Sequence, residues 1–422
     1  MGKIKGFKYL FEDKQEYFFL LDFGHSSIKA ALLEIDKQSK EAAILDVAEE
    51  LHPRHLKIAK EPENVSEIAG TIQRAISKLE HPEAKKTTRI VFGLASEMVY
   101  GHNFSYNHKR ESKNSKIDAR ELKNVIHTTE LKAYEEIRKK FLSESGYPET
   151  EVFLLNSSMQ DVRIDGYRVA NPMGFEGEEI LISVFNSYLP IFYKQLLEEV
   201  VEILKMDLYD IVYEPYSVFN VLRKNKGDDF ESLVIDIGGK TTRVSLVRKG
   251  RLEEVKTFSF GGESFTRRIA NYFQVGFWEA ENIKLRYNDG RLSESAKKKV
   301  EKILEREVTV FLGALEMVLK QFSRVNLLPA NIYIYGGGGN ILLMDAIIRK
   351  RKWKRDLSFF NPPKVHWLQH DDFPSIEVKE THISDGQYIS ILGVADHILQ
   401  KTTQPETFLS KTLKRMVNLV QT

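Results

Sequence analysis

Two stretches with the same pattern decide the fold, LDFGHSSIKAALLEI at residues 21–35 and LVIDIGGKTTRVSLV at residues 233–247. Each begins with an apolar strand that ends in an aspartate, Asp22 in the first and Asp236 in the second. A short turn rich in Gly, Ser and Thr then leads to another apolar strand. Because this unit returns in the second half of the chain, it indicates an internal duplication at domain scale. The sequence therefore predicts two lobes of similar construction, each opened by one of these hairpins.

Apolar strands alternate with helical patterns around the hairpins. The apolar run 180–185 is followed by a helical pattern over 189–204 and by a second strand over 208–213. Such alternation is typical of an α/β fold with a mixed or parallel sheet under helices. Between the hairpins, the polar residues 101–116 (GHNFSYNHKRESKNSK) predict a loop or the tip of a hairpin, and a helix is expected over 118–141.

The composition excludes several classes of protein. The chain has 422 residues, 42% of them hydrophobic and 29% charged, which suits two or more globular domains and is unlike collagenous, mostly disordered or integral-membrane chains. Cysteine is absent, so disulfide frameworks, zinc–thiolate sites and cysteine nucleophiles are excluded. The 62 Lys and Arg nearly balance the 60 Asp and Glu, so no nucleic-acid partner is expected. The first residues lack the cleavage site of a signal peptide, and we expect a cytoplasmic protein.

Both hairpin turns have the composition of a phosphate-binding loop. Glycine lets the backbone approach a ligand, N–H groups and hydroxyls donate to phosphate oxygens, and a strand-terminal Asp can hold hydrated Mg²⁺. The candidate residues are Gly24, Ser26 and Ser27 in the first turn and Gly238, Gly239, Thr241 and Thr242 in the second. Either turn alone also fits an ordinary hairpin, whereas two turns at matching places indicate a clamp around one polyphosphate.

Two further segments suit the rest of a nucleotide. The run IYIYGGGGN at residues 332–340 is a strand that ends in several glycines, where a flat group could lie against bare backbone. Glu281 and Lys284 are three residues apart on a predicted helix and share one face, from which they could hold ribose hydroxyls. The alternatives are a flexible loop for the glycines and an ordinary surface ion pair for the two charged residues.

The order of these motifs resembles the actin-like ATPase superfamily, which includes actin, heat-shock chaperones and sugar kinases. The motifs are LDFGHSSIKAALLEI, YEPYS, LVIDIGGKTTRVSLV, GGESFTRRIA, AENIK and IYIYGGGGN. Within the superfamily, the stretches DGY at 165–167, NPMGFEG at 171–177 and EP at 214–215 resemble the family of the bacterial cell-division protein FtsA. This resemblance implies an ATP-binding protein with the actin-like fold and an inserted subdomain of strand-helix-strand-strand type.

The resemblance also implies a role for individual residues. Glu214 matches an acid near the metal or the attacking water, and it forms the implied catalytic set with Asp22 and Asp236, the two aspartates that would hold Mg²⁺. The implied ATP-binding residues are Gly24, Ser26, Ser27, Lys29, Gly238, Gly239, Lys240, Thr241, Thr242, Gly262, Glu281, Lys284, Gly336, Gly337 and Gly338.

Some residues depart from the FtsA pattern. Arg243 follows the second turn where FtsA usually has Asp, and Arg268 replaces another Asp. Lys240 stands among the second-turn glycines, and His25 replaces a Thr or Ser of the first turn. Added cations favour phosphate binding, whereas lost carboxylates weaken metal placement and water activation. We therefore expect ATP binding with at most slow hydrolysis.

The resemblance implies a division into domains. The first lobe takes residues 1–95 and 178–225, the inserted subdomain takes 96–177, and the second lobe takes 226–262 and 300–400. Residues 263–299 are a reduced subdomain, shorter than the sheet-bearing subdomain of FtsA that docks the tail of FtsZ. This short version and the G-x-S-S-I-K turn resemble the pilus-assembly protein PilM, which offers an alternative role as a scaffold of a pilus or secretion platform.

The end of the chain, residues 401–422, is expected to be a linker and an amphipathic helix. Leu409, Leu413 and Met416 share one helical face, with basic residues opposite or beside it, which fits a helix in a membrane interface or one packed on its own domain. In FtsA such a helix is the membrane anchor, so the resemblance implies self-association into filaments and attachment of an FtsZ-like partner to an anionic membrane through 406–422.

The basic run 349–355 fits lipid headgroups, nucleic acid or a solvated helix end.

Overall fold

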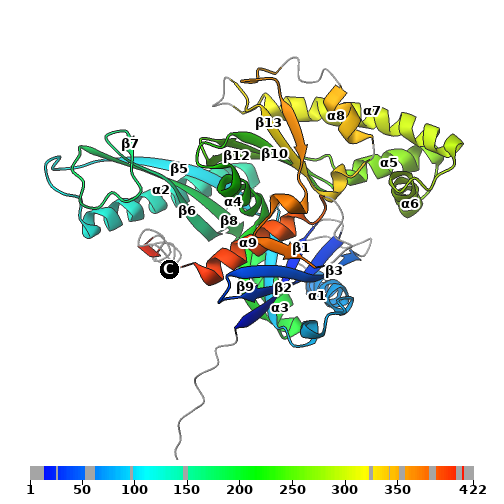
Figure 1. Cartoon of the computed structure of the whole chain (residues 1–422), viewed down its shortest axis with the longest axis horizontal. Coiled ribbons are helices and arrows are strands. Elements are labelled where there is room, and N and C mark those ends of the chain that lie inside the picture. Colours follow the sequence, from blue (N-terminus) through cyan, green and yellow to red (C-terminus); the bar gives the residue numbers. More distant parts are fainter. Residues whose placement is uncertain are drawn as a thin grey trace, which may run out of the picture.

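The computed structural model describes most of the chain in three sheets with helices around them (Figure 1). The described residues are 14–24, 27–52, 62–95, 98–145, 151–322, 327–341, 343–350, 357–379, 386–404 and 411–412. His25 and Ser26 of the first turn, most of the basic run 349–355 and most of the predicted membrane helix lie outside them. Among the described residues, no helix is long and apolar enough to cross a membrane.

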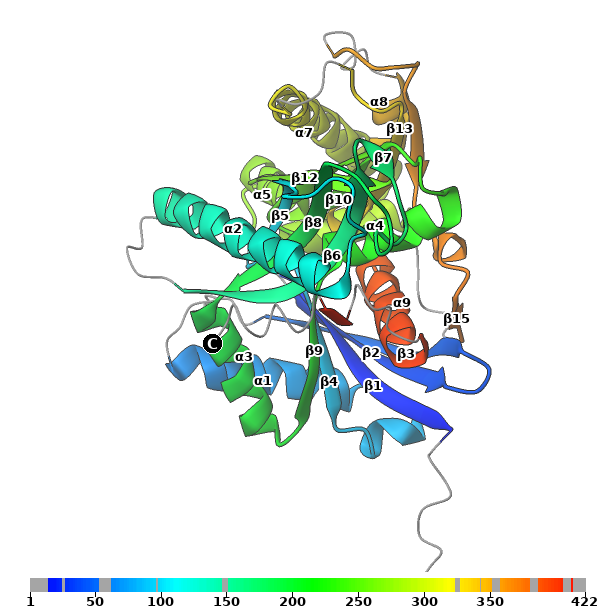
Figure 2. The same cartoon turned by 90° about the vertical axis from the view of Figure 1, so that its left-hand side faces the viewer.

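The first lobe is built on a six-stranded sheet with the order β15-β3-β2-β1-β4-β9. Its strands are β1 (Gln15–Phe23), β2 (Ser27–Asp36), β3 (Glu41–Leu51), β4 (Arg89–Leu94), β9 (Asp207–Tyr213) and β15 (Ile376–Val378). The predicted hairpin is β1 with β2, and β1 also pairs in parallel with β4, so β1 lies in the middle of the sheet with an apolar core on both faces. The helices around it are α1 (Pro62–Ser77), α3 (Ile191–Leu204), α4 (Glu214–Lys226) and α9 (Ile389–Thr403). Figure 2 shows α1 and α3 on one side of this sheet and α9 on the other.

The second lobe repeats the plan with a five-stranded sheet in the order β12-β11-β10-β13-β14. Its strands are β10 (Ser232–Ile237), β11 (Thr242–Arg248), β12 (Arg251–Phe258), β13 (Asn331–Tyr335) and β14 (Lys364–Trp367). The second predicted hairpin is β10 with β11, and β10 pairs in parallel with β13 just as β1 pairs with β4. The helices are α5 (Gly262–Phe273), α6 (Phe277–Asn288), α7 (Glu294–Leu319) and α8 (Met344–Lys350). The described residues 263–299 form helices and contain no strand.

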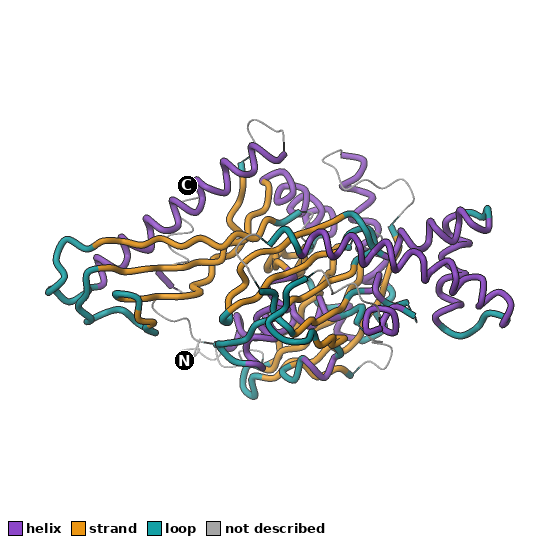
Figure 3. Tube along the Cα trace, turned by 90° about the horizontal axis from the view of Figure 1, so that it is seen from above, coloured by secondary structure: helices purple, strands orange, loops and turns teal. Residues whose placement is uncertain are grey.

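The inserted subdomain is a four-stranded sheet with one long helix. Its strands have the order β5-β8-β6-β7 and are β5 (Tyr100–Lys109), β6 (Val152–Ile164), β7 (Tyr167–Arg168) and β8 (Glu179–Pro190), with α2 (Ala119–Ser145) against them. In Figure 3 these strands extend from the body of the molecule at one end, and a helical part lies at the other. Short 3₁₀ helices are η1 (Pro82–Lys85), η2 (Gly337–Gly339) and η4 (His370–Asp372).

Three expectations about the organisation of the chain are wrong in detail. Residues 101–109 of the predicted loop belong to the strand β5, because they pair with β8, and only 110–116 form a loop. The inserted sheet continues past residue 177, because β8 pairs with both β5 and β6. The chain returns to the first lobe before residue 400, because β15 pairs with β3 and the apolar residues of α9 join the first lobe's core.

Candidate functional site

Each hairpin holds an aspartate opposite a basic residue. Asp22 at the end of β1 is the cross-strand partner of Lys29, whose Nζ lies 3.3 Å from Asp22 Oδ2. Asp236 at the end of β10 is likewise the partner of Arg243, whose Nη1 lies 2.9 Å from Asp236 Oδ2. All four side chains are nearly buried. The duplication therefore extends from the strands to a matching ion pair in each lobe.

Glu214 lies where the charges of both hairpins act on it. It is the first residue of α4, directly after β9, and its side chain is 2% exposed. Arg243 Nη1 lies 3.7 Å from Glu214 Oε2. The bare backbone of Gly93 on β4 makes room for this acid, because a Cβ there would lie 2.8 Å from Glu214 Oε1. The structure thus brings together the three acids of the predicted catalytic set.

Burial and like charge oppose the ionised form of Glu214. Burial raises the pKa of Glu214 well above its usual range, and Asp22 and Asp236 raise it further, while Arg243 and Lys29 oppose the rise. At Lys29, burial lowers the pKa, but the charges of Asp22 and Glu49 outweigh it and the net pKa is raised. The site therefore combines two firmly charged cations with three carboxyl groups, one of which favours its neutral form.

Glycine-lined loops of the second lobe meet through bare backbone. The N–H of Gly262 donates to Gly238 O at 2.9 Å, and a Cβ on Gly338 would lie only 2.0 Å from the same oxygen. Gly336 has φ of 102°, which favours glycine, and a Cβ there would lie 2.4 Å from Asp236 Oδ1. The structure thus brings the second turn, the start of α5 and the glycine run together. Gly337 is exposed in that run.

The segment before α9 joins the glycine run to the first hairpin. Gly386 O accepts a hydrogen bond from Gly336 N at 3.0 Å, and the carbonyl of the next residue, Gln387, accepts one from Lys29 Nζ at 2.9 Å. A single short segment therefore contacts the glycine run of the second lobe and the first hairpin.

Several predicted phosphate ligands have protein partners. The Ser27 hydroxyl donates to Glu49 Oε1 at 2.5 Å, and the Thr242 hydroxyl donates to Phe260 O at 2.6 Å. The remaining described turn residues, Gly24, Gly238, Gly239, Lys240 and Thr241, lie at partly or fully exposed positions. The Gly238 N–H also has a partner, because it donates to Thr241 O at 2.9 Å. A phosphate at the second turn would therefore depend on the other backbone groups of the turn and on Arg243, and not on the hydroxyls of Ser27 and Thr242 or the N–H of Gly238.

Glu281 and Lys284 share one face of α6, as the spacing predicts, and they tie this helix to α5. Lys284 Nζ lies 2.8 Å from Glu281 Oε2 and donates to Thr266 Oγ1 at 2.9 Å and to Gly262 O at 3.3 Å. The Thr266 hydroxyl in turn donates to Glu281. The pair lies beside Gly262, so it sits next to the glycine-lined loops and also holds two helices together.

The residues of the site fit a polyphosphate better than they fit a metal ion. Two buried cations and bare turn backbone suit phosphate oxygens. The oxygens of Asp22 and Asp236, by contrast, already face Lys29 and Arg243. In the part of the chain that the structure describes, no group of three or more His, Asp or Glu side chains could hold a metal ion. The predicted Mg²⁺ role of the two aspartates therefore does not fit this arrangement.

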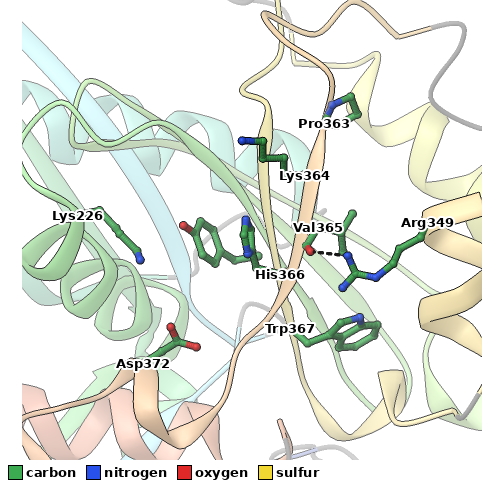
Figure 4. A pocket seen from close by; sticks show the side chains of 9 residues that line it. Lys226, Arg349, Pro363, Lys364, Val365, His366, Trp367 and Asp372 are labelled. Carbon is green, nitrogen blue, oxygen red and sulfur yellow. Dashed lines mark hydrogen bonds between the residues drawn. The ribbon is translucent and has the colours of Figure 1, made fainter.

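A separate pocket of about 780 Å³ lies along the edge strand β14 (Figure 4). Its charged and aromatic lining comprises Lys226, Tyr333, Arg349, Lys364, His366, Trp367 and Asp372. Figure 4 shows His366 and Trp367 pointing to opposite sides of β14, so the hollow runs around a sheet edge. None of the predicted site residues lines it.

Sequence reasoning missed the ion pairs and the glycine that accommodates Glu214. A signal for the pairs is present, because the base follows the acid at the same spacing in both hairpins. A signal for Gly93 is also present, since an isolated glycine inside an apolar strand indicates the close approach of another group.

Two lobes with duplicated hairpins and an inserted subdomain make up the actin-like ATPase fold, which the motifs predicted. The solved PilM–PilN type IV pilus biogenesis complex contains a chain similar to this one, with a TM-score of 0.63 and 16% identity over 91% of this chain and 98% of that chain.

Comparison of sequences adds the likeness to FtsA. A family model described as "Cell division protein FtsA" matches residues 233–347. Cell division protein FtsA of Enterococcus faecalis is 22% identical over 273 residues, 64% of this chain and 57% of that protein. The protein of the same name from Pseudomonas aeruginosa is 22% identical over 205 residues, 44% of this chain and 49% of its own length. The predicted resemblance to FtsA is thus confirmed, and the chain spans about half the length of these relatives.

Proposed function

We propose that this protein is an FtsA-like, actin-fold protein that binds ATP between its two hairpins and joins a cell-division filament to a membrane. The observation that carries the proposal is the pair of matching hairpins whose charges meet at Glu214. The likeness to FtsA over residues 233–347 includes the second hairpin and the glycine run, and it supports a division role.

In this proposal the chain's own residues bind and orient the nucleotide. Lys29 and Arg243 donate to phosphate oxygens, and the turn backbones of Gly24 and Gly238 lie close to them. The glycine run from Gly336 to Gly338 takes the adenosine. When bound, ATP supplies a transferable phosphoryl group, and Glu214 is the acid placed to orient water. Its contact with Arg243 leads us to expect slow turnover at most.

Nucleotide binding is tested by titrating the purified chain with a fluorescent ATP analogue. We expect saturable binding that unlabelled ATP displaces. Asp236→Ala should weaken it at least tenfold, because this change releases Arg243 from its place beside the turn. Binding that is absent, or that is the same in Asp236→Ala, would refute the nucleotide site.

Membrane attachment and self-association form the second half of the proposal. We propose that residues 406–422 attach the protein peripherally to the inner face of the cell membrane. One such helix gives modest affinity, which self-association into filaments multiplies by avidity. The assay is co-sedimentation with anionic vesicles, with and without residues 406–422 and with and without ATP. We expect pelleting that depends on these residues and increases with ATP, and equal pelleting of the truncated chain would refute the anchor.

One observation favours a second candidate, a PilM-like scaffold of a pilus or secretion platform. The described residues 263–299 are helical, with α6 ending at Asn288 and α7 beginning at Glu294, so no sheet is available there to dock a filament protein. A peptide partner bound to the inserted subdomain, together with the absence of filaments on vesicles, would support this role over the first.

A further inference from the structure

In each hairpin a basic residue pairs with the aspartate, so neither aspartate is well suited to hold a divalent cation. A divalent cation in a nucleotide site is held by carboxylate oxygens, waters and phosphates, and it offsets phosphate charge. Here Lys29 lies 3.3 Å from Asp22, and Arg243 lies 2.9 Å from Asp236. Both candidate metal ligands thus have a fixed positive charge beside them.

Arg243 also lies next to the turn where a phosphate would bind. A Cβ on Gly238 would lie 3.0 Å from Arg243 Nη2, so the guanidinium is adjacent to the bare backbone of that turn. The guanidinium has five N–H donors in a planar fork, and this shape suits a carboxylate and a phosphate together. Arg243 can therefore keep its contact with Asp236 while it donates to a phosphate oxygen.

Lys29 holds the corresponding position in the first lobe. Its amine contacts Asp22 and donates to Gln387 O at 2.9 Å, so it is held between the first hairpin and the segment before α9. The two cations thus stand at matching places, one in each lobe. Each cation stays paired with its aspartate, so what the two offer the phosphates is N–H donors at two fixed points, one in each lobe.

We propose that this site binds its nucleotide without a divalent cation, with Lys29 and Arg243 as the fixed counter-charges of the phosphates. This inference rests on the proposed function, because it concerns the same site. It assigns the nucleotide a structural role as a stable bridge between the lobes. Without a mobile metal to stabilise the charge that develops in phosphoryl transfer, the bound nucleotide persists unhydrolysed.

The test compares binding of the fluorescent ATP analogue to the full chain in excess EDTA and in excess Mg²⁺. We expect dissociation constants that agree within about threefold, a difference of less than about 1 kcal/mol. Binding that is tenfold or more tighter with Mg²⁺ would overturn the inference while leaving the proposed function in place. The absence of saturable binding in both buffers would overturn the proposed function itself, and the inference with it.

Variants at Arg243 test the assigned residue. Arg243→Gln removes the charge but keeps a similar size, and we expect binding in EDTA to weaken at least tenfold. Arg243→Lys keeps the charge but loses the fork, and it should weaken binding less. Arg306→Gln, the same change at an exposed position on α7, is the matched control and should bind as the unchanged chain does. Circular dichroism establishes that each variant is folded. Unweakened binding by a folded Arg243→Gln in EDTA would show that Arg243 is not the counter-charge.

Discussion

Arg243 Nη1 lies 2.9 Å from Asp236 Oδ2, and the two residues stand directly opposite each other across the second hairpin. Both side chains are less than 10% exposed, so this ion pair has little contact with water. A buried pair of this kind gives limited net stability, but breaking it leaves an uncompensated charge in a poorly solvated place. The pair therefore makes the second hairpin sensitive to the loss of either partner.

The first prediction concerns this sensitivity. Arg243→Ala leaves Asp236 beside Glu214 without the shared cation, and we expect it to lower the free energy of unfolding by about 3 kcal/mol. Urea denaturation followed by circular dichroism measures the change. Arg243→Lys restores a positive charge and should recover part of the loss. A loss below about 1 kcal/mol in Arg243→Ala would mean that water reaches the pair.

The second prediction contrasts two neighbouring glycines. A Cβ at Gly338 would lie 2.0 Å from Gly238 O, whereas the nearest atom to a Cβ at Gly337 is Gln387 Cβ at 3.6 Å. Gly338→Ala should therefore destabilise the fold by about 1–3 kcal/mol through overpacking and should also weaken ATP binding. Gly337→Ala is the matched control and should leave the urea midpoint nearly unchanged. Equal midpoints for the two variants would contradict the close approach of these loops.

Much of the fold could be predicted because its signals are local. The two hairpins and their apolar strands follow from short patterns around Asp22 and Asp236. The strand β5 could not be predicted, because its polar residues are satisfied by partners far away in the chain. Asn103, for example, donates to Leu252 O at 3.0 Å in the second lobe. The three-residue strand β15 could not be predicted from the sequence either, because it is defined only by its pairing with β3.

The candidate site also has features that the sequence predicts and features that it does not. Glycine content and the positions of the acids are visible in the sequence, so the loops and Glu214 could be named. The partner of each side chain depends on register and burial. Ser27 and Thr242 look like phosphate ligands by type, yet their hydroxyls donate to Glu49 and Phe260. The equal spacing of acid and base in the two hairpins is visible in the sequence, while the contact within each ion pair follows from the register of the paired strands.

The third prediction concerns the contact between the inserted subdomain and the second lobe. Asp161 on β6 is nearly buried, and Arg251 Nη1 on β12 reaches its Oδ2 at 3.3 Å. Arg163 lies 2.7 Å from the same carboxylate, so Asp161 keeps a partner when Arg251 is lost. Arg251→Ala should therefore cost only about 1 kcal/mol in global stability while it loosens the subdomain locally. Hydrogen exchange measures this as faster exchange in β5, β6 and β12.

A second change tests whether the contacts made by Arg251 and Asn103 between the inserted subdomain and the second lobe act together. Asn103→Ala removes the hydrogen bond to Leu252 O in the same interface. If Arg251 and Asn103 hold one rigid interface, the double variant should differ from the sum of the single variants by about 0.5 kcal/mol or more. Strict additivity, with exchange in β5 unchanged, would mean that the subdomain is held by other contacts.

The fourth prediction is a pH dependence at the contact between α9 and the first sheet. Asp210 on β9 lies 2.7 Å from Lys401 Nζ and 3.4 Å from His397 Nε2, both on α9. Burial alone would raise the pKa of Asp210, but His397 and Lys401 outweigh it and lower the pKa to about 2. Because an unfolded Asp has a pKa of about 3.9, ionised Asp210 stabilises the folded state above that pH.

This contribution should be complete near neutral pH and should disappear as the pH falls from about 4 toward about 2. At pH 7 we expect Asp210→Asn to lower the free energy of unfolding by about 2 kcal/mol, and the difference from the unchanged chain should shrink as the pH approaches 3. Urea denaturation over this pH range measures it. Asp207→Asn, the same change at an exposed position on β9, is the control and should have a small effect at every pH. A difference for Asp210→Asn that stays constant down to pH 3 would mean that the hydrogen-bond geometry, and not the charge of Asp210, fastens α9 to the first lobe.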